Sequence, residues 1–207
     1  MDLIAELLDR TRRVATYAAF TTFATFILLA VFALPGHAAE IAGVKLPPTA
    51  QVGSQALVFN GAGVRSVAFF RVYAAALYLP EPKRTAPEIL TASGPKRLSM
   101  TMLRDVTAKQ LIEALNNGIR DNNPPAEVER LRPRIEQLTR IMADIGKAAS
   151  GSVITLDFVP GTGTQVGLDG RTPGAIPGED LYRAILSIWL GDDPVDAALK
   201  KGLLGQQ

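Results

Sequence analysis

Short segments of alternating apolar and polar residues recur along the chain, which is the pattern of strands that bury one face in a sheet. In residues 96–103 (KRLSMTML), for example, Leu98, Met100 and Met102 fall on one face and mostly polar residues on the other. An Asp–Gly pair at 169–170 is a strong signal for a tight hairpin turn. We predict strands over residues 41–46, 55–59, 96–103, 152–159 and 164–168, with a hairpin return over 171–176.

Other segments repeat apolar residues every three or four positions, as helices do. Residues 108–122 and 178–190 show this spacing most clearly, and a short amphipathic helix over 194–204 closes the chain. Residues 127–147 carry another apolar stripe. Pro133 lies inside that stripe, so it is expected to break or kink the helix or to mark its true start.

The order of these elements is strands, a helical pair, strands and terminal helices. Short hairpin connections between the strands favour antiparallel pairing. We therefore predict one α+β domain, in which a mainly antiparallel sheet carries a layer of helices on one face.

The stretch at residues 60–80 (NGAGVRSVAFFRVYAAALYLP) is the most informative in the chain. It opens with a glycine-rich turn and contains enough Val, Phe and Tyr for two short strands or one long bent one. On an unbroken strand, Arg65, Phe69 and Tyr73 share a face. A cation, an aromatic ring and a phenol on one face suggest a pocket with an anion-binding end. The alternative is that Arg65 closes a turn and Arg71 is solvated.

Residues 1–39 differ in character from the rest. A positively charged end precedes an uncharged apolar run over residues 14–34, and a Pro–Gly pair and small residues follow. These are the parts of a secretory signal, so we expect cleavage after Ala38 or Ala39 and a periplasmic or otherwise exported protein. The run is long for a signal, and the alternative is an uncleaved inner-membrane anchor. The domain proper covers residues 40–207.

Composition excludes several kinds of chemistry. Lys and Arg total 22 against 20 Asp and Glu, a net charge of +2, so we expect no nucleic-acid partner. The chain has no cysteine, and its one histidine, His37, lies in the segment expected to be removed. The mature domain is therefore not expected to hold a metal or another cofactor. Any catalysis falls to Asp, Glu, Lys, Tyr or bound water.

Three smaller features have ordinary structural interpretations. The Gly61–Gly63 segment is too short for a dinucleotide-binding loop and opens a strand rather than a helix. Asp157 lies inside an apolar strand, so we expect it on the solvent face or paired with a basic strand residue such as Arg71. Trp189 falls at helical spacing, which favours a core position over a ligand platform.

Read together, the motifs GAGVR, FFRVYAAALYL and DLYRAILSIWLGDDPVDAALKKGLLG resemble the chalcone isomerase-like superfamily, and more narrowly its short bacterial exported members. The segment LSMTMLRDVTAKQLIEALNNGI fits the family's strand followed by a long helix. The resemblance implies an open-faced β-sandwich whose helices enclose an apolar cleft. It also implies that Arg65 sits at the ligand end of that cleft, where relatives hold a flavonoid or a fatty-acid carboxylate. The tyrosine that assists in the fatty-acid-binding relatives corresponds best to Tyr73.

The departures from the isomerases concern polar residues. Leu111 stands where they carry a tyrosine, Gly118 where they carry an asparagine, and Ser99 where they carry a lysine. Ile188 and Trp189 replace a threonine–methionine pair. The resemblance therefore implies an apolar pocket with one charged end rather than chalcone isomerase chemistry.

We accordingly expect a protein that binds a fatty acid or a similar amphipathic anion, without catalysis or with weak catalysis. Arg65 and Tyr73 would hold the head group. The tail would lie among Phe69, Leu111, Leu115, Ile185, Ile188 and Trp189. Two alternatives are an isomerase or lyase that acts on a chalcone-like conjugated substrate, and a cell-envelope accessory module that binds a partner. Contact with a membrane is expected only through an uncleaved N-terminal segment.

Overall fold

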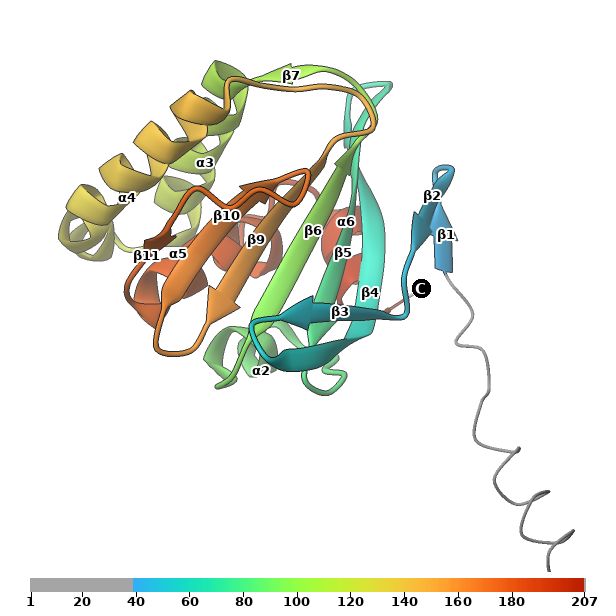
Figure 1. The fold of residues 1–207 in the computed structure, drawn as a ribbon, viewed down its shortest axis with the longest axis horizontal. Coiled ribbons are helices and arrows are strands. Elements are labelled where there is room, and N and C mark those ends of the chain that lie inside the picture. Colours follow the sequence, from blue (N-terminus) through green and yellow to red (C-terminus); the bar gives the residue numbers. More distant parts are fainter. Residues whose placement is uncertain (1–38, 207) are drawn as a thin grey trace, which may run out of the picture. The chain divides into compact units, whose positions relative to one another are not determined.

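The computed structural model describes residues 39–206, and a large antiparallel sheet forms its centre (Figure 1). The strands of this sheet are β3 (Thr49–Val52), β4 (Gln55–Val67), β5 (Phe70–Leu79), β6 (Lys96–Met102), β9 (Val153–Val159), β10 (Gly163–Leu168) and β11 (Ala175–Ile176). They lie in the order β11-β10-β9-β6-β5-β4-β3. Two small ladders complete the strands, β1 (Ala39–Ile41) with β2 (Val44–Leu46) and β7 (Val106–Thr107) with β8 (Lys147–Ala148).

Helices cover one face of the sheet and bury the main core against it. They are α2 (Ala86–Thr91), α3 (Ala108–Asn122), α4 (Pro125–Ile145), α5 (Glu179–Leu190) and α6 (Ala197–Leu203). Leu98, Met100 and Met102 of β6 all face this core and are at most 8% exposed, as the alternation predicted. The predicted α+β fold, with an antiparallel sheet and a helical layer, is confirmed.

The opposite face of the sheet has a second, smaller core. β1, β2 and β3 pack there against alternate residues of β4 and β5, and the Tyr78 hydroxyl donates to the carbonyl of Pro47 at 3.1 Å. Asp157 is paired, but with Arg97 rather than with the suggested Arg71: the guanidinium of Arg97 donates to both carboxylate oxygens, at 2.7 and 2.5 Å. Arg97 lies directly opposite Asp157 across the β6–β9 ladder, which makes this pairing the local one.

The predicted signal or anchor segment, residues 1–39, lies outside the described residues apart from Ala39. Within the described part of the chain, no helix is long and apolar enough to cross a membrane.

A predicted turn and a predicted strand had different outcomes. Residues 169–170 form the expected tight turn, with φ of 49° at Asp169 and 81° at Gly170. The single strand predicted over residues 41–46 is wrong, because Ala42 and Gly43 take positive φ values and fold the segment into the β1–β2 hairpin.

The turn predicted at the glycine-rich segment is wrong, since β4 runs through this segment as one strand of 13 residues. Gly61 and Gly63 both face α6. A β-carbon on Gly61 would lie 2.7 Å from the carbonyl oxygen of Leu203, and one on Gly63 would lie 2.8 Å from Cδ1 of Leu199. The two glycines are therefore explained by the close approach of a helix.

Asn60 of β4 holds the C-terminal end of α6 against the sheet. Its side-chain nitrogen donates to the carbonyl of Leu203 at 2.7 Å, and its side-chain oxygen accepts from the backbone N–H of Lys83 at 2.7 Å. Asn60 is buried, so both of its polar atoms need such partners. The segment NGAG thus specifies how α6 docks on the sheet.

Helix α4 continues through Pro133, so the predicted interruption or later start of the helix is wrong. A proline inside a helix removes one backbone hydrogen bond and costs about 3 kcal/mol. Leu131, Ile135 and Leu138 of α4 are buried in the main core on both sides of the proline. Burial of such side chains contributes about 1.5–3 kcal/mol each, which offsets that cost.

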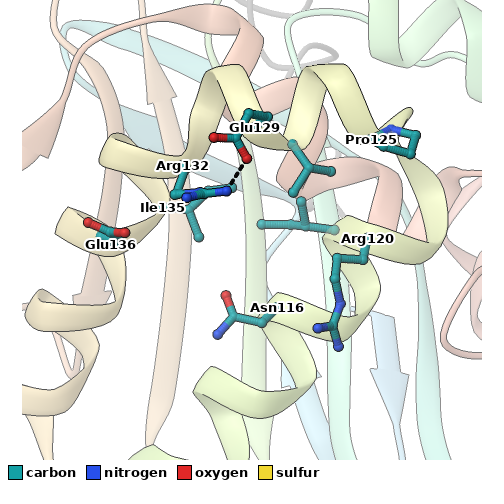
Figure 2. A pocket seen from close by; sticks show the side chains of 9 residues that line it. Asn116, Arg120, Pro125, Glu129, Arg132, Ile135 and Glu136 are labelled. Carbon is teal, nitrogen blue, oxygen red and sulfur yellow. Dashed lines mark hydrogen bonds and ion pairs between the residues drawn. The ribbon is translucent and has the colours of Figure 1, made fainter.

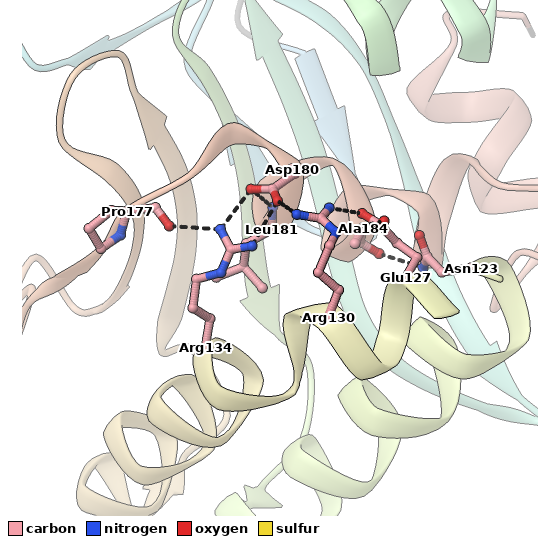
Figure 3. Close-up of polar contacts among 8 residues, drawn as sticks. All are labelled: Asn123, Glu127, Arg130, Arg134, Pro177, Asp180, Leu181 and Ala184. Atoms are coloured by element: carbon pink, nitrogen blue, oxygen red, sulfur yellow. Dashed lines mark hydrogen bonds and ion pairs between the residues drawn. The ribbon is translucent and has the colours of Figure 1, made fainter. Parts of the chain in front are cut away.

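A charged cluster ties α4 to the start of α5 (Figure 3). Arg134 donates to both carboxylate oxygens of Asp180 at 2.7 Å, and Arg130 donates to one of them at 2.7 Å. Hydrogen bonds from Arg134 and Arg130 outweigh partial burial and hold the pKa of Asp180 well below its ordinary value. Asp180 also lies in the first turn of α5, where a negative charge is favourable.

We expect Gly61→Ala to lower the free energy of unfolding by about 1–3 kcal/mol, because its methyl group would overlap the backbone at the end of α6. Thermal denaturation followed by circular dichroism measures the loss. Gly174→Ala is the matched control, since a β-carbon there meets nothing within 4 Å and its φ is not positive. Equal melting temperatures for the two variants would contradict the role of Gly61.

We expect Asp180→Asn to lower the free energy of unfolding at neutral pH by about 1–3 kcal/mol. Because the pKa of Asp180 is lowered in the folded protein, its contribution is complete above the unfolded pKa of about 3.9 and is lost as pH falls below it. The difference between wild type and variant should therefore be largest above about pH 5 and shrink in acid. Urea denaturation across this range measures it.

The control for this experiment is Glu129→Gln, which removes the exposed partner of Arg132 on the outer side of α4. An exposed pair of this kind contributes little. If both variants lose the same stability at every pH, the Asp180 cluster does not anchor α4.

Candidate functional site

An apolar cavity of about 100 Å³ lies between the sheet and helices α3, α4 and α5. Six residues that were predicted to surround a ligand line it: Tyr73, Leu111, Leu115, Ile185, Ile188 and Trp189. The prediction missed the contributions of the strands and of α4, among them Met100, Ile154, Leu138 and Met142. Alternation in β6 already placed Met100 on the core face, so this pattern could have predicted Met100 as a cavity residue.

Regular spacing brings the helical residues to the cavity. Leu111 and Leu115 are one turn apart on α3, and Ile185, Ile188 and Trp189 form a stripe on α5. Gly118 allows the two helices to approach, since a β-carbon there would lie 2.7 Å from Cγ2 of Ile188. The glycine at this position therefore has a packing role.

Tyr73 and Trp189 supply the polar atoms of the cavity wall. The indole Nε1 of Trp189 donates to the Tyr73 hydroxyl at 2.8 Å. Burial raises the pKa of Tyr73 to about 12, although the hydrogen bond from Trp189 and the charge of Arg65 act in the opposite direction. The phenol is therefore protonated at neutral pH. Because it already accepts from Trp189, its own proton is available to an oxygen of a ligand.

Arg65 and Tyr73 are side by side because they are paired across the β4–β5 hairpin. The prediction brought them together by alternation along one strand, whereas the chain turns back between them. Arg65 donates to the carbonyl of Ser66 at 2.6 Å and pairs with Asp196 at 3.5 Å. Its side chain is 26% exposed, and it lies next to the cavity wall rather than in it.

Asp196 links this charged pair to α6. It is the N-cap of the helix, accepting from the backbone N–H of Leu199 at 3.0 Å, and it accepts from the backbone N–H of Ser66 at 3.3 Å. Burial opposes its ionisation, but these hydrogen bonds and the charge of Arg65 keep the pKa of Asp196 below its ordinary value. The carboxylate therefore stays charged beside Arg65, whose five N–H groups leave donors for a further anion.

Phe69 does not belong to the cavity, so its assignment to the tail channel does not hold. It lies at the turn between β4 and β5 with 99% of its surface exposed. Val67 and Phe70 pair across the turn, which leaves Ala68 and Phe69 as the loop. The predicted shared face with Arg65 and Tyr73 assumed an unbroken strand.

A second hollow lies outside the cavity, between α3 and α4, and measures about 470 Å³ (Figure 2). Its floor is apolar, with Ile119, Val128 and Ile135. Its rim carries the side chains of two arginines and two glutamates, Arg120, Arg132, Glu129 and Glu136. These rim residues are exposed, and Glu129 pairs with Arg132, so the hollow is a solvated groove between two helices.

Ser99, which stands at the lysine position of the isomerases, and the two asparagines just before Gly118 on α3 do not reach the cavity. Ser99 alternates with the buried Leu98 and Met100 and so faces the opposite side of the sheet. Asn116 lines the outer groove, and Asn117 accepts from Arg120 on the surface of α3. Among residues 39–206, no three His, Asp or Glu side chains are grouped so as to hold a metal ion.

Comparison with known proteins identifies the fold family. Residues 38–205 match the family model described as chalcone isomerase-like (Chalcone_3). The chain belongs to the chalcone isomerase-like family. No curated protein sequence matches it.

Among solved structures, the chalcone isomerase-like domain is similar to the fatty-acid binding protein AtFAP1 of Arabidopsis thaliana. The TM-score is 0.60 at 18% sequence identity, and the alignment covers 78% of this chain and 92% of AtFAP1. At this identity the likeness concerns the fold. The predicted resemblance to the chalcone isomerase-like superfamily is confirmed by the family match and by this shared fold, and its narrower form, a short bacterial exported member, stays a prediction.

Trp189 is the single tryptophan of the chain, so its fluorescence reports on the cavity alone. We expect Tyr73→Phe to shift its emission to shorter wavelength, because the variant removes the acceptor of the indole N–H. Tyr78→Phe is the control, since that hydroxyl donates to Pro47 on the opposite face of the sheet. Identical spectra for wild type and Tyr73→Phe would show that the hydrogen bond is absent in solution.

Proposed function

We propose that this protein binds a fatty acid or a similar amphipathic carboxylate without chemical turnover. The head group would contact Tyr73 and Arg65, and the tail would occupy the apolar cavity. The observation that carries the proposal is the composition of the cavity wall. Methionine sulfurs apart, the residues described there offer two polar side-chain atoms, the Tyr73 hydroxyl and Trp189 Nε1, and both lie at the end next to Arg65.

The chemistry of this end suits binding better than proton transfer. With its pKa raised to about 12, Tyr73 is a neutral hydrogen-bond donor at physiological pH. Arg65 supplies charge-assisted hydrogen bonds that a carboxylate accepts. The naming of AtFAP1 as a fatty-acid binding protein supports the same class of ligand for a chain of this fold.

The size of the cavity limits how the tail binds. Pockets for small molecules usually measure about 300–1,000 Å³, whereas this cavity measures about 100 Å³. Met100 and Met142 both line it, and methionine side chains repack easily because they are unbranched and flexible. We therefore infer that a tail enters as these side chains rotate. Each methylene then buried contributes about 0.8 kcal/mol.

Export of the protein is part of the proposal. The N-terminal 39 residues have the composition of a secretory signal or an anchor. Either arrangement would place a ligand-binding domain outside the cytoplasm, where fatty acids move between membranes and solution.

The head-group assignment predicts opposite effects for two substitutions. Arg65→Met should weaken binding of decanoate about tenfold to hundredfold, because charge-assisted hydrogen bonds contribute about 1.5–3 kcal/mol. Asp196→Asn should strengthen it severalfold, because the competing charge is removed while asparagine still caps α6. Quenching or enhancement of Trp189 fluorescence on titration measures both affinities.

Decanol is the control ligand, since it has the same tail and no charge. Its affinity should be nearly equal in wild type, Arg65→Met and Asp196→Asn. If Arg65→Met retains full affinity for decanoate, the head group does not bind at Arg65. Conversion of a chalcone-type substrate by wild type, lost in Tyr73→Phe, would favour the isomerase alternative.

A further inference from the structure

The turn between β4 and β5 presents apolar side chains directly to solvent. Phe69 is 99% exposed, Phe70 64% and Val67 52%. These side chains belong to residues 67–70, the hairpin tip. Four large apolar side chains are exposed among those that the structure describes; three belong to this tip and the fourth is Val58. Contiguous exposed apolar residues of this kind usually mark a surface that binds something.

The local structure gives no reason for apolar residues at this turn. Tight hairpin turns favour Gly, Asn or Asp, since these residues accept positive φ and their polar groups remain solvated. Here Ala68 takes a φ of 52° and Phe69 follows it with its ring in solvent. The turn thus accepts an unfavourable backbone conformation and a large exposed ring, neither of which improves the packing of the described domain.

Basic side chains lie immediately behind the tip. Arg71 follows Phe70 in β5, and the guanidinium of Arg104 lies 5.4 Å from the centroid of the Phe70 ring. Neither arginine forms an ion pair with another residue of the described part of the chain. Two carboxylates near these strands are each paired with a cation, Asp105 with Lys147 and Asp196 with Arg65. Asp169, at the same end of the sheet, accepts a hydrogen bond from the backbone N–H of Val153.

We propose that the hairpin tip inserts into the surface of a lipid bilayer that contains anionic lipids. The phenylalanine rings would enter the boundary between head groups and acyl chains, and Arg71 and Arg104 would contact the lipid phosphates. A protein partner fits less well. Two phenylalanines can bury at most roughly 300–500 Å², whereas a stable protein interface buries about 800 Å² on each partner.

The tip is joined to the candidate site by the same two strands. Arg65 lies two residues before Val67, and Tyr73 lies three residues after Phe70. Insertion of the tip would therefore bring the polar end of the cavity to the bilayer surface. This second step rests on the proposed function: a fatty acid would pass between the membrane and the cavity along the hairpin without crossing water.

Because the chain has no cysteine, a single introduced cysteine can report on the tip in the full-length protein. Ala68→Cys keeps Val67, Phe69 and Phe70 and would carry a polarity-sensitive dye. Thr162→Cys is the matched control, since it lies at the exposed turn between β9 and β10, at the opposite end of the sheet. The probes are vesicles of phosphatidylcholine with and without phosphatidylglycerol.

We expect the dye at position 68, and not the dye at 162, to shift to shorter wavelength with vesicles that contain phosphatidylglycerol. Brominated lipids should quench it. Adding Phe69→Ser to Ala68→Cys should raise the lipid concentration for half of the shift at least about tenfold, and Arg71→Gln with Arg104→Gln should reduce the dependence on anionic lipid.

Three results would overturn the proposal: no shift at position 68, equal shifts at positions 68 and 162, or a shift that appears on raising the protein concentration without lipid. The last would assign the tip to contact between copies of the chain. Phe69→Ser alone should bind decanoate in solution as wild type does. A failure of membrane insertion is therefore distinguishable from a failure of the proposed ligand binding.

Discussion

The close contact between α6 and β4 determines much of the arrangement around the candidate site. It is possible because Gly61 and Gly63 have no side chains, and Asn60 holds the far end of the helix through its hydrogen bond to Leu203. The near end begins at Asp196, which caps α6 and pairs with Arg65. Docking of the helix therefore fixes the carboxylate that neutralises and orients the arginine. One strand, β4, carries both the docking surface and the cation, so any shift of α6 changes the charge presented beside the cavity.

The elements with regular periodicity were predictable from the sequence. Alternation in β6 and helical spacing in α3 and α5 identified their core faces, because burial of one face determines those patterns. Six of the cavity residues followed from the same patterns together with the family resemblance. The apolar stripe of α4 was predicted, but its spacing does not specify that it lines the cavity. Pro133 suggested an interruption of this helix, and only packing in the core explains why the helix persists.

The errors arose where a residue serves a distant contact. The segment NGAG has the composition of a turn, and its glycines are needed only because α6, more than 130 residues later in the chain, lies against them. Phe69 was assigned to the cavity because alternation along one unbroken strand places it on the face of Arg65 and Tyr73, whereas the chain turns back at this residue. Pairing of Arg65 with Tyr73 was anticipated for a wrong reason, since it depends on the hairpin and not on alternation along one strand. Sequence periodicity describes faces of single elements, and it does not specify which elements meet.

The polar end of the cavity and the apolar hairpin tip both bear on how a ligand reaches the cavity. A buried phenol and a partly neutralised arginine are weak attractants for an anion in water, where a carboxylate is well solvated. A small apolar cavity likewise contributes little binding free energy until a ligand tail fills and widens it. Both difficulties diminish if the ligand arrives from a bilayer, because its tail is then already removed from water and its head group lies among phosphates at the level of Arg71 and Arg104. The hairpin would then work as the path between two apolar environments, with Tyr73 and Arg65 at the crossing point.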